Sequence, residues 1–158
     1  MTTGETTTHQ AGPTATDAAT GPIDFLALEF PRDRLAGDAA RALADLVEAG
    51  TIRLYDLVVL SKDAEGQVEV VDLADPSLPS GGFAAFAGAR SGLLGEDDVA
   101  TAADALRPGT VAALLVYENA WAAPFVAAAR RSGGELVASS RIPAADVVAA
   151  LDALDRTT

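Results

Sequence analysis

The residues with the clearest chemical potential in this 158-residue chain lie together in the run Tyr-Glu-Asn-Ala-Trp at 117–121. They follow an apolar run and precede a predicted helix, a place where side chains and free helix N–H groups often converge on a ligand. We take Tyr117, Glu118, Asn119 and Trp121 as candidate ligand-binding residues: Glu118 as base or anchor, Asn119 as a hydrogen-bonding group and Trp121 as a stacking surface. The alternative is structural. Asn119 then caps the helix, Glu118 is solvated, and Trp121 packs against the core or a partner.

Carboxylates on or beside predicted strands form a second candidate set. Opposed carboxylates bind divalent cations through oxygen, or divide into acid and base when their surroundings differ. Asp56 lies inside an apolar strand and needs either solvent or a cationic partner such as Arg53 or Arg34. The sequence does not bring the set together, so we expect solvated or salt-bridged side chains and name no metal, cofactor or catalytic residue. The set comprises Asp24, Glu29, Asp56, Asp72 and Glu118.

Composition excludes several kinds of chemistry. The absence of cysteine excludes disulfides, thiolate metal sites and cysteine nucleophiles. The single histidine, His9, lies in a Thr-rich tail, so His-dependent triads and multi-histidine metal sites are excluded as well. Lys62, the sole lysine, is beside a predicted hairpin turn rather than in a pocket suited to a Schiff base. A net charge of −12 disfavours nucleic acid as a partner.

The stretch 74–95 is rich in glycine and proline and matches neither a phosphate loop nor a nucleophile elbow. Small residues four positions apart permit close approach of backbones, and the neighbouring phenylalanine and leucine side chains add an apolar surface. Two interpretations remain open: a loop that folds back over the sheet, and a contact between subunits. The candidate interface residues are Phe83, Phe86, Gly88, Gly92 and Leu93.

Hydrophobic periodicity predicts the elements that position these residues. The runs 23–30 and 111–117 are apolar on both faces, which favours central strands. We expect strands at 23–30, 52–61, 67–73, 111–117 and 135–141, and helices at 38–49, 96–107, 120–132 and from Pro143 onward. The order predicts an α+β fold with a ferredoxin-like β-α-β-β-α-β core extended by α-β-α. Right-handed crossovers would place the helices mainly on one face of a mixed, largely antiparallel sheet.

The flanks of this predicted domain indicate its organisation and compartment. Residues 1–20 are poor in apolar side chains, so we expect a disordered tail followed by a single domain at 21–155. No secretory signal and no apolar stretch long enough for a membrane span is present, which favours the cytoplasm and disfavours membrane insertion.

Several short motifs together resemble a known family. They are Gly21-Pro22-Ile23-Asp24, Gly50-Thr51-Ile52-Arg53, Tyr117-Glu118-Asn119-Ala120-Trp121 and Gly133-Gly134-Glu135-Leu136. The chain resembles domain-of-unknown-function family 6325, an uncharacterised family of high-GC bacteria, over about residues 21–154. It is more distantly similar to a glycine-rich family often labelled a putative membrane protein. Arg90 and the short apolar run at 74–95 depart from a membrane-inserting version. The resemblance implies no activity, cofactor or site residue.

Two functions of different classes follow. A ferredoxin-like sheet with helices on one face leaves an apolar face that a second subunit can cover. We therefore expect a non-catalytic, acidic interaction module whose partner is a second copy of itself or another protein, through the sheet face, the sheet edge or the 74–95 loop. The alternative is a small-molecule-binding protein or enzyme that uses the end of the strand at Tyr117, Glu118, Asn119 and Trp121.

Overall fold

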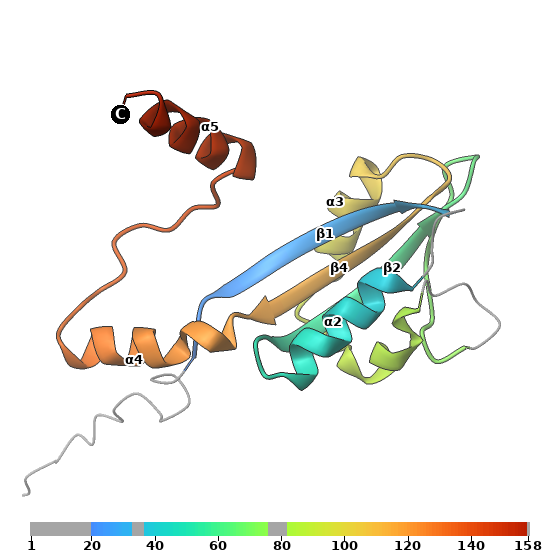
Figure 1. Cartoon of the computed structure of the whole chain (residues 1–158). Coiled ribbons are helices and arrows are strands. Elements are labelled where there is room, and N and C mark those ends of the chain that lie inside the picture. The colour runs from blue at the N-terminus through green and yellow to red at the C-terminus, as the bar shows by residue number, and fades with distance from the viewer. Residues whose placement is uncertain (1–19, 33–36, 76–81, 158) are drawn as a thin grey trace, which may run out of the picture. The chain divides into compact units, whose positions relative to one another are not determined.

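The computed structural model describes residues 20–32, 37–75 and 82–157 (Figure 1). His9, Arg34 and residues 1–19 of the predicted tail lie outside them. The chain divides into two compact units, Met1–Ala128 and Ala129–Thr158. Its elements, in order, are β1 (Ile23–Pro31), α2 (Asp38–Glu48), β2 (Arg53–Lys62), β3 (Val68–Val70), η2 (Phe83–Ala89), α3 (Glu96–Ala105), β4 (Thr110–Glu118), η3 (Ala120–Ala122), α4 (Ala123–Arg131) and α5 (Ala144–Asp155).

The four strands form one antiparallel sheet in the order β1-β4-β2-β3, which confirms the α+β class. β4 pairs along its length with β1 on one side and β2 on the other, so its apolar run correctly predicted a central strand. β1 has the same kind of sequence but lies at an edge of the sheet. The prediction of a central position for β1 is therefore wrong.

The ferredoxin-like topology is not confirmed. β1 and β2 are both antiparallel to β4, which separates them. β1, α2 and β2 therefore form a split β-α-β unit, in which β4 lies between β1 and β2. The predicted strand at 135–141 is not formed: these residues belong to neither a helix nor a strand. A strand exists only when another strand pairs with it, and none of the described residues in the second unit forms one.

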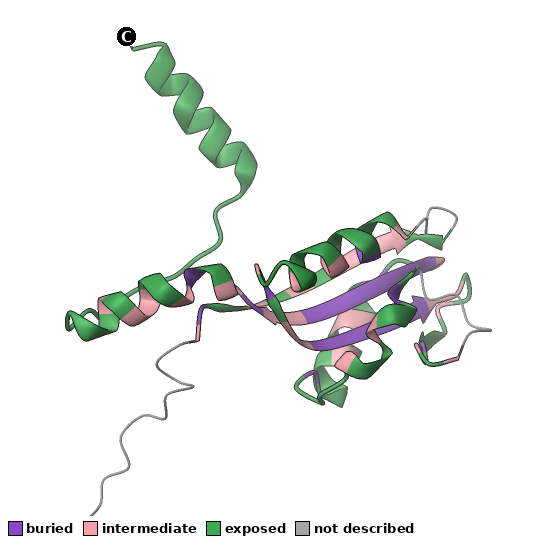
Figure 2. Cartoon of the chain, turned by 60° about the horizontal axis from the view of Figure 1, so that its bottom comes forward, coloured by how far each residue is buried: buried purple, intermediate pink, exposed green. Residues whose placement is uncertain are grey.

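Helices cover both faces of the sheet, so the expectation that they lie mainly on one face is wrong (Figures 1 and 2). Alternate residues of β4 face opposite sides. Val111, Ala113 and Leu115 pack with Ala40 of α2 and with Phe83, whereas the other face of β4 packs on Leu106 and α3. The residues of this second apolar cluster are Val58, Leu60, Leu94, Leu106, Ala112 and Leu114.

The connection between β3 and α3 explains why both faces are covered. β3 pairs only with Leu60–Lys62, so no strand of the described residues pairs with the other half of the outer edge of β2. Residues 83–95 use this free half: Phe83 packs in the α2-side cluster and Leu94 in the α3-side cluster. The chain thus passes from one face of the sheet to the other. A crossover rule that assumes a connection on a single face does not apply here.

Local chemistry sets the ends of α3. Three acidic residues, Glu96, Asp97 and Asp98, occupy its first turn, where they complement the positive end of the helix dipole. At the other end, Lys62 Nζ donates hydrogen bonds of 3.0 Å to the carbonyl oxygens of Ala103 and Leu106. The only lysine of the chain therefore caps a helix.

Candidate functional site

The four candidate ligand-binding residues do not face a common site. Tyr117 and Asn119 line an apolar groove of about 450 Å³ on the α2 side of the sheet, and Glu118 belongs to the opposite face. Successive residues of a strand point to opposite faces, which explains the division. Apart from Tyr117 and Asn119, the groove is lined by Leu26, Leu28, Ala39, Ala42, Leu43, Leu46, Ile52, Phe83 and Leu115.

Glu118 is a buried carboxylate, with 2 % of its surface exposed. Its Oε1 accepts a hydrogen bond of 2.8 Å from the Tyr55 hydroxyl and lies 3.9 Å from Arg53 Nη1. Its Oε2 accepts a bond of 3.2 Å from the backbone N–H of Gly21. Glu118 therefore ties the chain before β1 to the beginning of β2, which is a structural task, and it is not the solvated side chain of the alternative interpretation.

Asn119 joins β4 to the start of β1. Its backbone N–H donates to the carbonyl oxygen of Pro22 at 2.7 Å, and its Nδ2 donates to the same oxygen at 3.1 Å and to Asp24 Oδ2 at 2.8 Å. It makes no side-chain cap of η3, although capping was the expected structural role. A Cβ at Gly21 would overlap the Asn119 carbonyl oxygen, so only glycine permits this close approach.

Trp121 contributes its backbone rather than its ring to the fold. Its N–H donates to the carbonyl oxygen of Thr51 at 3.2 Å, and 68 % of the residue is exposed. Trp121 does not line the groove that Tyr117 and Asn119 share. The run at 117–121 is therefore a junction between β1, β2 and β4, and two of its side chains border an apolar hollow.

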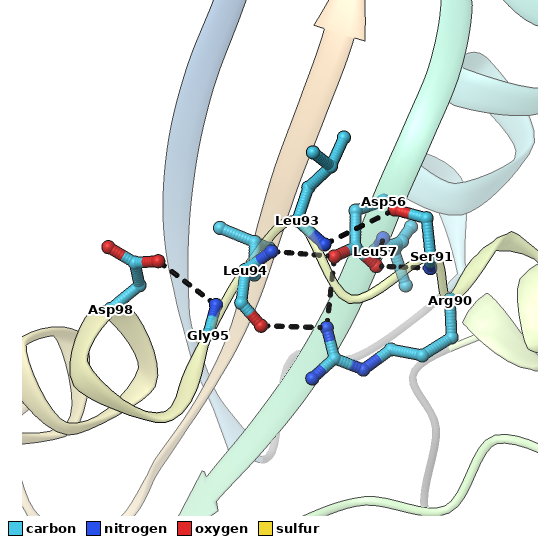
Figure 3. A network of polar contacts seen from close by, with 8 residues as sticks. All are labelled: Asp56, Leu57, Arg90, Ser91, Leu93, Leu94, Gly95 and Asp98. Carbon is cyan, nitrogen blue, oxygen red and sulfur yellow. Dashed lines mark hydrogen bonds and ion pairs between the residues drawn. The ribbon is translucent and has the colours of Figure 1, made fainter.

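Asp56 organises the most extensive polar network described in the chain (Figure 3). A β-bulge lies between Leu54 and Asp56 of β2, so that Tyr55 is the extra residue. The Asp56 carboxylate accepts four hydrogen bonds of 2.8–3.1 Å and is 0 % exposed. Its donors are the backbone N–H groups of Leu57, Ser91 and Leu94 and the guanidinium of Arg90.

This network fastens the crossing segment to β2. Arg90 Nη1 lies 3.0 Å from Asp56 Oδ2 and also donates to the Leu94 carbonyl oxygen at 3.2 Å. The expected partners of Asp56 were Arg53 and Arg34, so the sequence indicated the need for a cation but not its position. Arg90 lies 34 residues away in a glycine-rich loop, and nothing in the spacing links the two.

Among the described residues, three side chains have shifted pKa values. Burial is the largest single effect on Asp56 and raises its pKa, but the Leu94, Ser91 and Arg90 hydrogen bonds together outweigh it, so the pKa is below its ordinary value. The bond from Arg107 lowers the pKa of Glu29. The bond to Glu118 raises the pKa of Tyr55, because ionised tyrosine would lose it and would face a second negative charge.

The candidate carboxylates bind different partners. Arg107 bonds Glu29 through its backbone N–H at 3.2 Å and its Nε at 3.0 Å, and Asp72 accepts the backbone N–H of Ala74 at 2.9 Å. Asp24, Asp56 and Glu118 have the partners described above. Within the described residues, no three His, Cys, Asp or Glu side chains are placed to hold a metal ion. Nor does any helix there have the length and apolarity needed to cross a membrane.

The candidate interface residues of the 74–95 loop occupy different environments. Phe83 is buried at 3 % exposure, and its ring lies 6.3 Å from that of the half-buried Phe86, so these side chains serve the chain's own core. Leu93 is 61 % exposed. Gly88 and Gly92 have open space around them, and the φ of Gly92 is +86°. Of the set, Gly88, Gly92 and Leu93 are exposed.

The largest apolar exposure in the sheet was not anticipated. Ile23 and Phe25, on the face of β1 opposite α2, are 55 % and 52 % exposed. The sequence showed that β1 is apolar on both faces, but not that it lies at an edge of the sheet, where α2 and α3 leave Ile23 and Phe25 exposed. Its edge position follows from which strands pair, and single-strand patterns carry no such information.

Comparison with known proteins identifies one matching family. A family model described as "Family of unknown function (DUF6325)" matches residues 19–156, which confirms the resemblance seen in the sequence. No curated protein and no solved structure matches the chain.

Proposed function

The chain belongs to DUF6325, a family of unknown function, and we propose that it is a non-catalytic module that associates with itself through the free edge of its sheet. One observation carries this proposal: β1 is a nine-residue edge strand with exposed apolar side chains. Long apolar edges are templates for pairing with another strand, and proteins normally shorten, charge or cover them.

The open sheet face that first suggested self-association does not supply this support, because α2 and α3 cover the two faces of β2 and β4. The opposite edge of the sheet is different. β3 is only three residues long, and all three are exposed and include Glu69. Short, charged edges resist pairing with another strand. A partner strand would therefore form more hydrogen bonds and bury more apolar surface at β1 than at β3.

Size-exclusion chromatography with light scattering tests this proposal. We expect a mass of more than one 16.0 kDa subunit at micromolar concentration. Phe25→Lys should weaken the association, because it places a charge beside the edge. Val68→Lys on β3, which also replaces an exposed apolar side chain of an edge strand, should not. A 16.0 kDa species at every concentration up to about 100 µM would refute self-association.

The groove beside β1 supports a second candidate function, the binding of a small molecule. Its volume of about 450 Å³ is within the range of ligand sites, its lining is mostly apolar, and Tyr117 and Asn119 provide polar groups at the margin. This composition suits an apolar ligand with one polar end. A second hollow of about 540 Å³, bordered by Arg53 and Gly88, is also present.

Binding of the fluorescent probe 1-anilinonaphthalene-8-sulfonate tests the groove. Ala42→Trp fills the groove from α2 and should abolish saturable binding, whereas Asp45→Trp, on the same helix outside the groove lining, should not. Equal binding by both variants would show that the probe binds elsewhere, and absence of binding by the unmodified chain would remove this candidate.

A further inference from the structure

The groove between β1 and α2 has a single polar end, and the groups at that end restrict what it can bind. All the residues described as lining the groove belong to the first compact unit, and none of them is charged. Tyr117 and Asn119, the two polar ones, lie on one face at the end of β4. In a site of this composition the apolar walls hold the body of a ligand, and the few polar groups select its head group.

The hydrogen bonds of the Asn119 side chain fix the orientation of its amide. Nδ2 donates to the Pro22 carbonyl oxygen at 3.1 Å and to Asp24 Oδ2 at 2.8 Å. Both partners only accept hydrogen bonds, so they must face the amide nitrogen, and they use its two N–H groups. The described residues donate no hydrogen bond to Oδ1, and none of their buried polar side-chain atoms lacks a partner, so Oδ1 is accessible. The group that Asn119 offers to a ligand is therefore an acceptor.

Asp24 adds a negative charge at the same end of the groove. It is the cross-strand partner of Tyr117, and its carboxylate lies 2.8 Å from Asn119 Nδ2. The alternation of β1 places Asp24 on the same face as Leu26 and Leu28, which line the groove. A charge beside an apolar hollow acts through a lower dielectric constant than a charge in water. This end of the groove therefore favours a positively charged donor.

The neighbouring basic side chains are paired with carboxylates. Arg53 borders the second hollow, which shares Ile52 with the groove, and its Nη1 lies 3.9 Å from Glu118 Oε1. Arg41 of α2 forms an ion pair with Asp38. The whole chain has a net charge of −12, and this field attracts cations and repels anions. An anionic head group is therefore disfavoured both locally and by the molecule as a whole.

We propose that the groove binds a small organic cation, an alkyl- or arylamine whose ammonium group donates to Asn119 Oδ1 beside Asp24. The apolar body of this ligand then lies against the leucine side chains of β1 and α2. The inference rests on the second candidate function above and names its class of ligand. The apolar helix α5 of the chain itself has no basic residue and lacks the charge that this end favours, because its charged residues are Asp146, Asp152 and Asp155.

Isothermal titration calorimetry of the full-length chain with three octyl compounds tests the head group. Octylamine, octanol and octanoate share one apolar body and carry a positive, a neutral and a negative head at neutral pH. We expect octylamine to bind about fivefold or more tightly than octanol at low ionic strength, and octanoate to bind most weakly. Propylamine, which has the charge but little apolar body, should show no measurable binding.

Asp24→Asn tests the origin of the preference, because it retains an acceptor for Asn119 Nδ2 and removes the charge. The preference for octylamine over octanol should be lost, while binding of octanol shows that the groove is intact. Binding of 1-anilinonaphthalene-8-sulfonate, an anion, should become tighter in the same variant. Asp104→Asn is the matched control, since Asp104 is exposed on α3, which packs on the other face of the sheet. It changes the net charge equally and should alter neither affinity.

The other outcomes overturn defined statements. Equal affinity for octylamine and octanol would refute the cationic ligand while the groove remains a binding site. Tighter binding of octanoate would do the same and would indicate an anion site at Arg53. Equal loss of preference in both aspartate variants would assign it to net charge instead of Asp24. Unchanged binding of octylamine by Ala42→Trp would place the amine outside the groove. Failure of all three octyl compounds to bind would refute both this inference and the second candidate function.

Discussion

Asp56 connects parts of the chain that are distant in sequence. Its carboxylate accepts hydrogen bonds from the backbone N–H groups of Ser91 and Leu94 and from the guanidinium of Arg90. A single side chain of β2 therefore holds the segment that crosses the sheet edge. The bulge at Tyr55 makes this possible, because it shifts the alternation of β2 and lets Leu54 and Leu57 pack in the same cluster. A buried charge with a complete set of donors costs little, whereas the same group without them costs several kcal/mol.

Replacement of Asp56 by asparagine should therefore destabilise the fold strongly. The amide keeps one oxygen acceptor but places an N–H₂ group among donors and leaves Arg90 without its counter-charge. We expect the free energy of unfolding to fall by about 2–3 kcal/mol, measured by urea denaturation. Asp45→Asn, an exposed position on α2, should change it by less than about 0.5 kcal/mol. Equal effects of the two substitutions would contradict the role given to Asp56.

The comparison of the unmodified chain with Asp56→Asn also predicts how stability depends on pH. The pKa of Asp56 in the folded chain is below its ordinary value of 3.8, so folding favours the ionised form. This contribution is fully present above the unfolded pKa and is lost as pH falls through the lower folded pKa. The free energy of unfolding of the unmodified chain should exceed that of Asp56→Asn by a constant amount between about pH 5 and 7. This difference should shrink below about pH 4. An advantage that grows on acidification would contradict this assignment.

At the scale of elements, the junction between β1 and β4 is the most constrained contact. Asn119 and Glu118, at the end of β4, both bind the chain at Gly21 and Pro22, just before β1 begins. The polar groups at 117–121 therefore hold an edge strand in register with a central one, and they leave the groove between β1 and α2 open. This placement gives the exposed edge of β1 a defined position.

Alanine substitution of two glycines tests the junction. A Cβ at Gly21 overlaps the Asn119 carbonyl oxygen, so Gly21→Ala should lower the free energy of unfolding by about 1–3 kcal/mol. Gly88, in η2, has nothing within 4 Å of the added atom and no positive φ. Gly88→Ala should be neutral or stabilising by up to about 1 kcal/mol. Chemical denaturation of the two variants side by side measures both effects, and a neutral Gly21→Ala would show that the junction can relax.

At the scale of the molecule, apolar surface is unevenly distributed. β2 and β4 are buried between α2 and α3, and these two strands contain most of the residues below 2 % exposure. β1 and α5, by contrast, expose large apolar side chains. Surface of this kind is typical of a chain whose folding is completed by association.

Stability should consequently depend on protein concentration. If folding and dimerisation are linked, a tenfold increase in concentration adds up to about 1.4 kcal/mol per dimer, because mass action favours the associated state. We expect the Tm to rise by about 2–4 °C for each tenfold increase between 1 and 100 µM, measured by scanning fluorimetry. Phe25→Lys should reduce this dependence. A Tm that is independent of concentration across this range would argue against linked association.

Periodicity and composition by themselves determined the local elements and the kinds of chemistry that are absent. The helix at Glu96 and the central strand at Val111 were predictable because each depends on residues that are neighbours in sequence: a first turn of carboxylates, and an uninterrupted apolar run. The need of Asp56 for a cation was also visible, because burial of a lone charge is costly wherever it occurs.

The tertiary structure alone decided which strands pair, which face of the sheet each helix covers and which partners the polar side chains contact. Whether β1 lies at the edge or in the centre depends on pairing energies spread over the whole sheet, and its own pattern fits both. The position of Arg90 beside Asp56 depends on the path of a loop around an edge that exists only because β3 is short. The separation of Glu118 from Tyr117 and Asn119 follows from the pleat of β4, which sends adjacent side chains to opposite faces of the sheet.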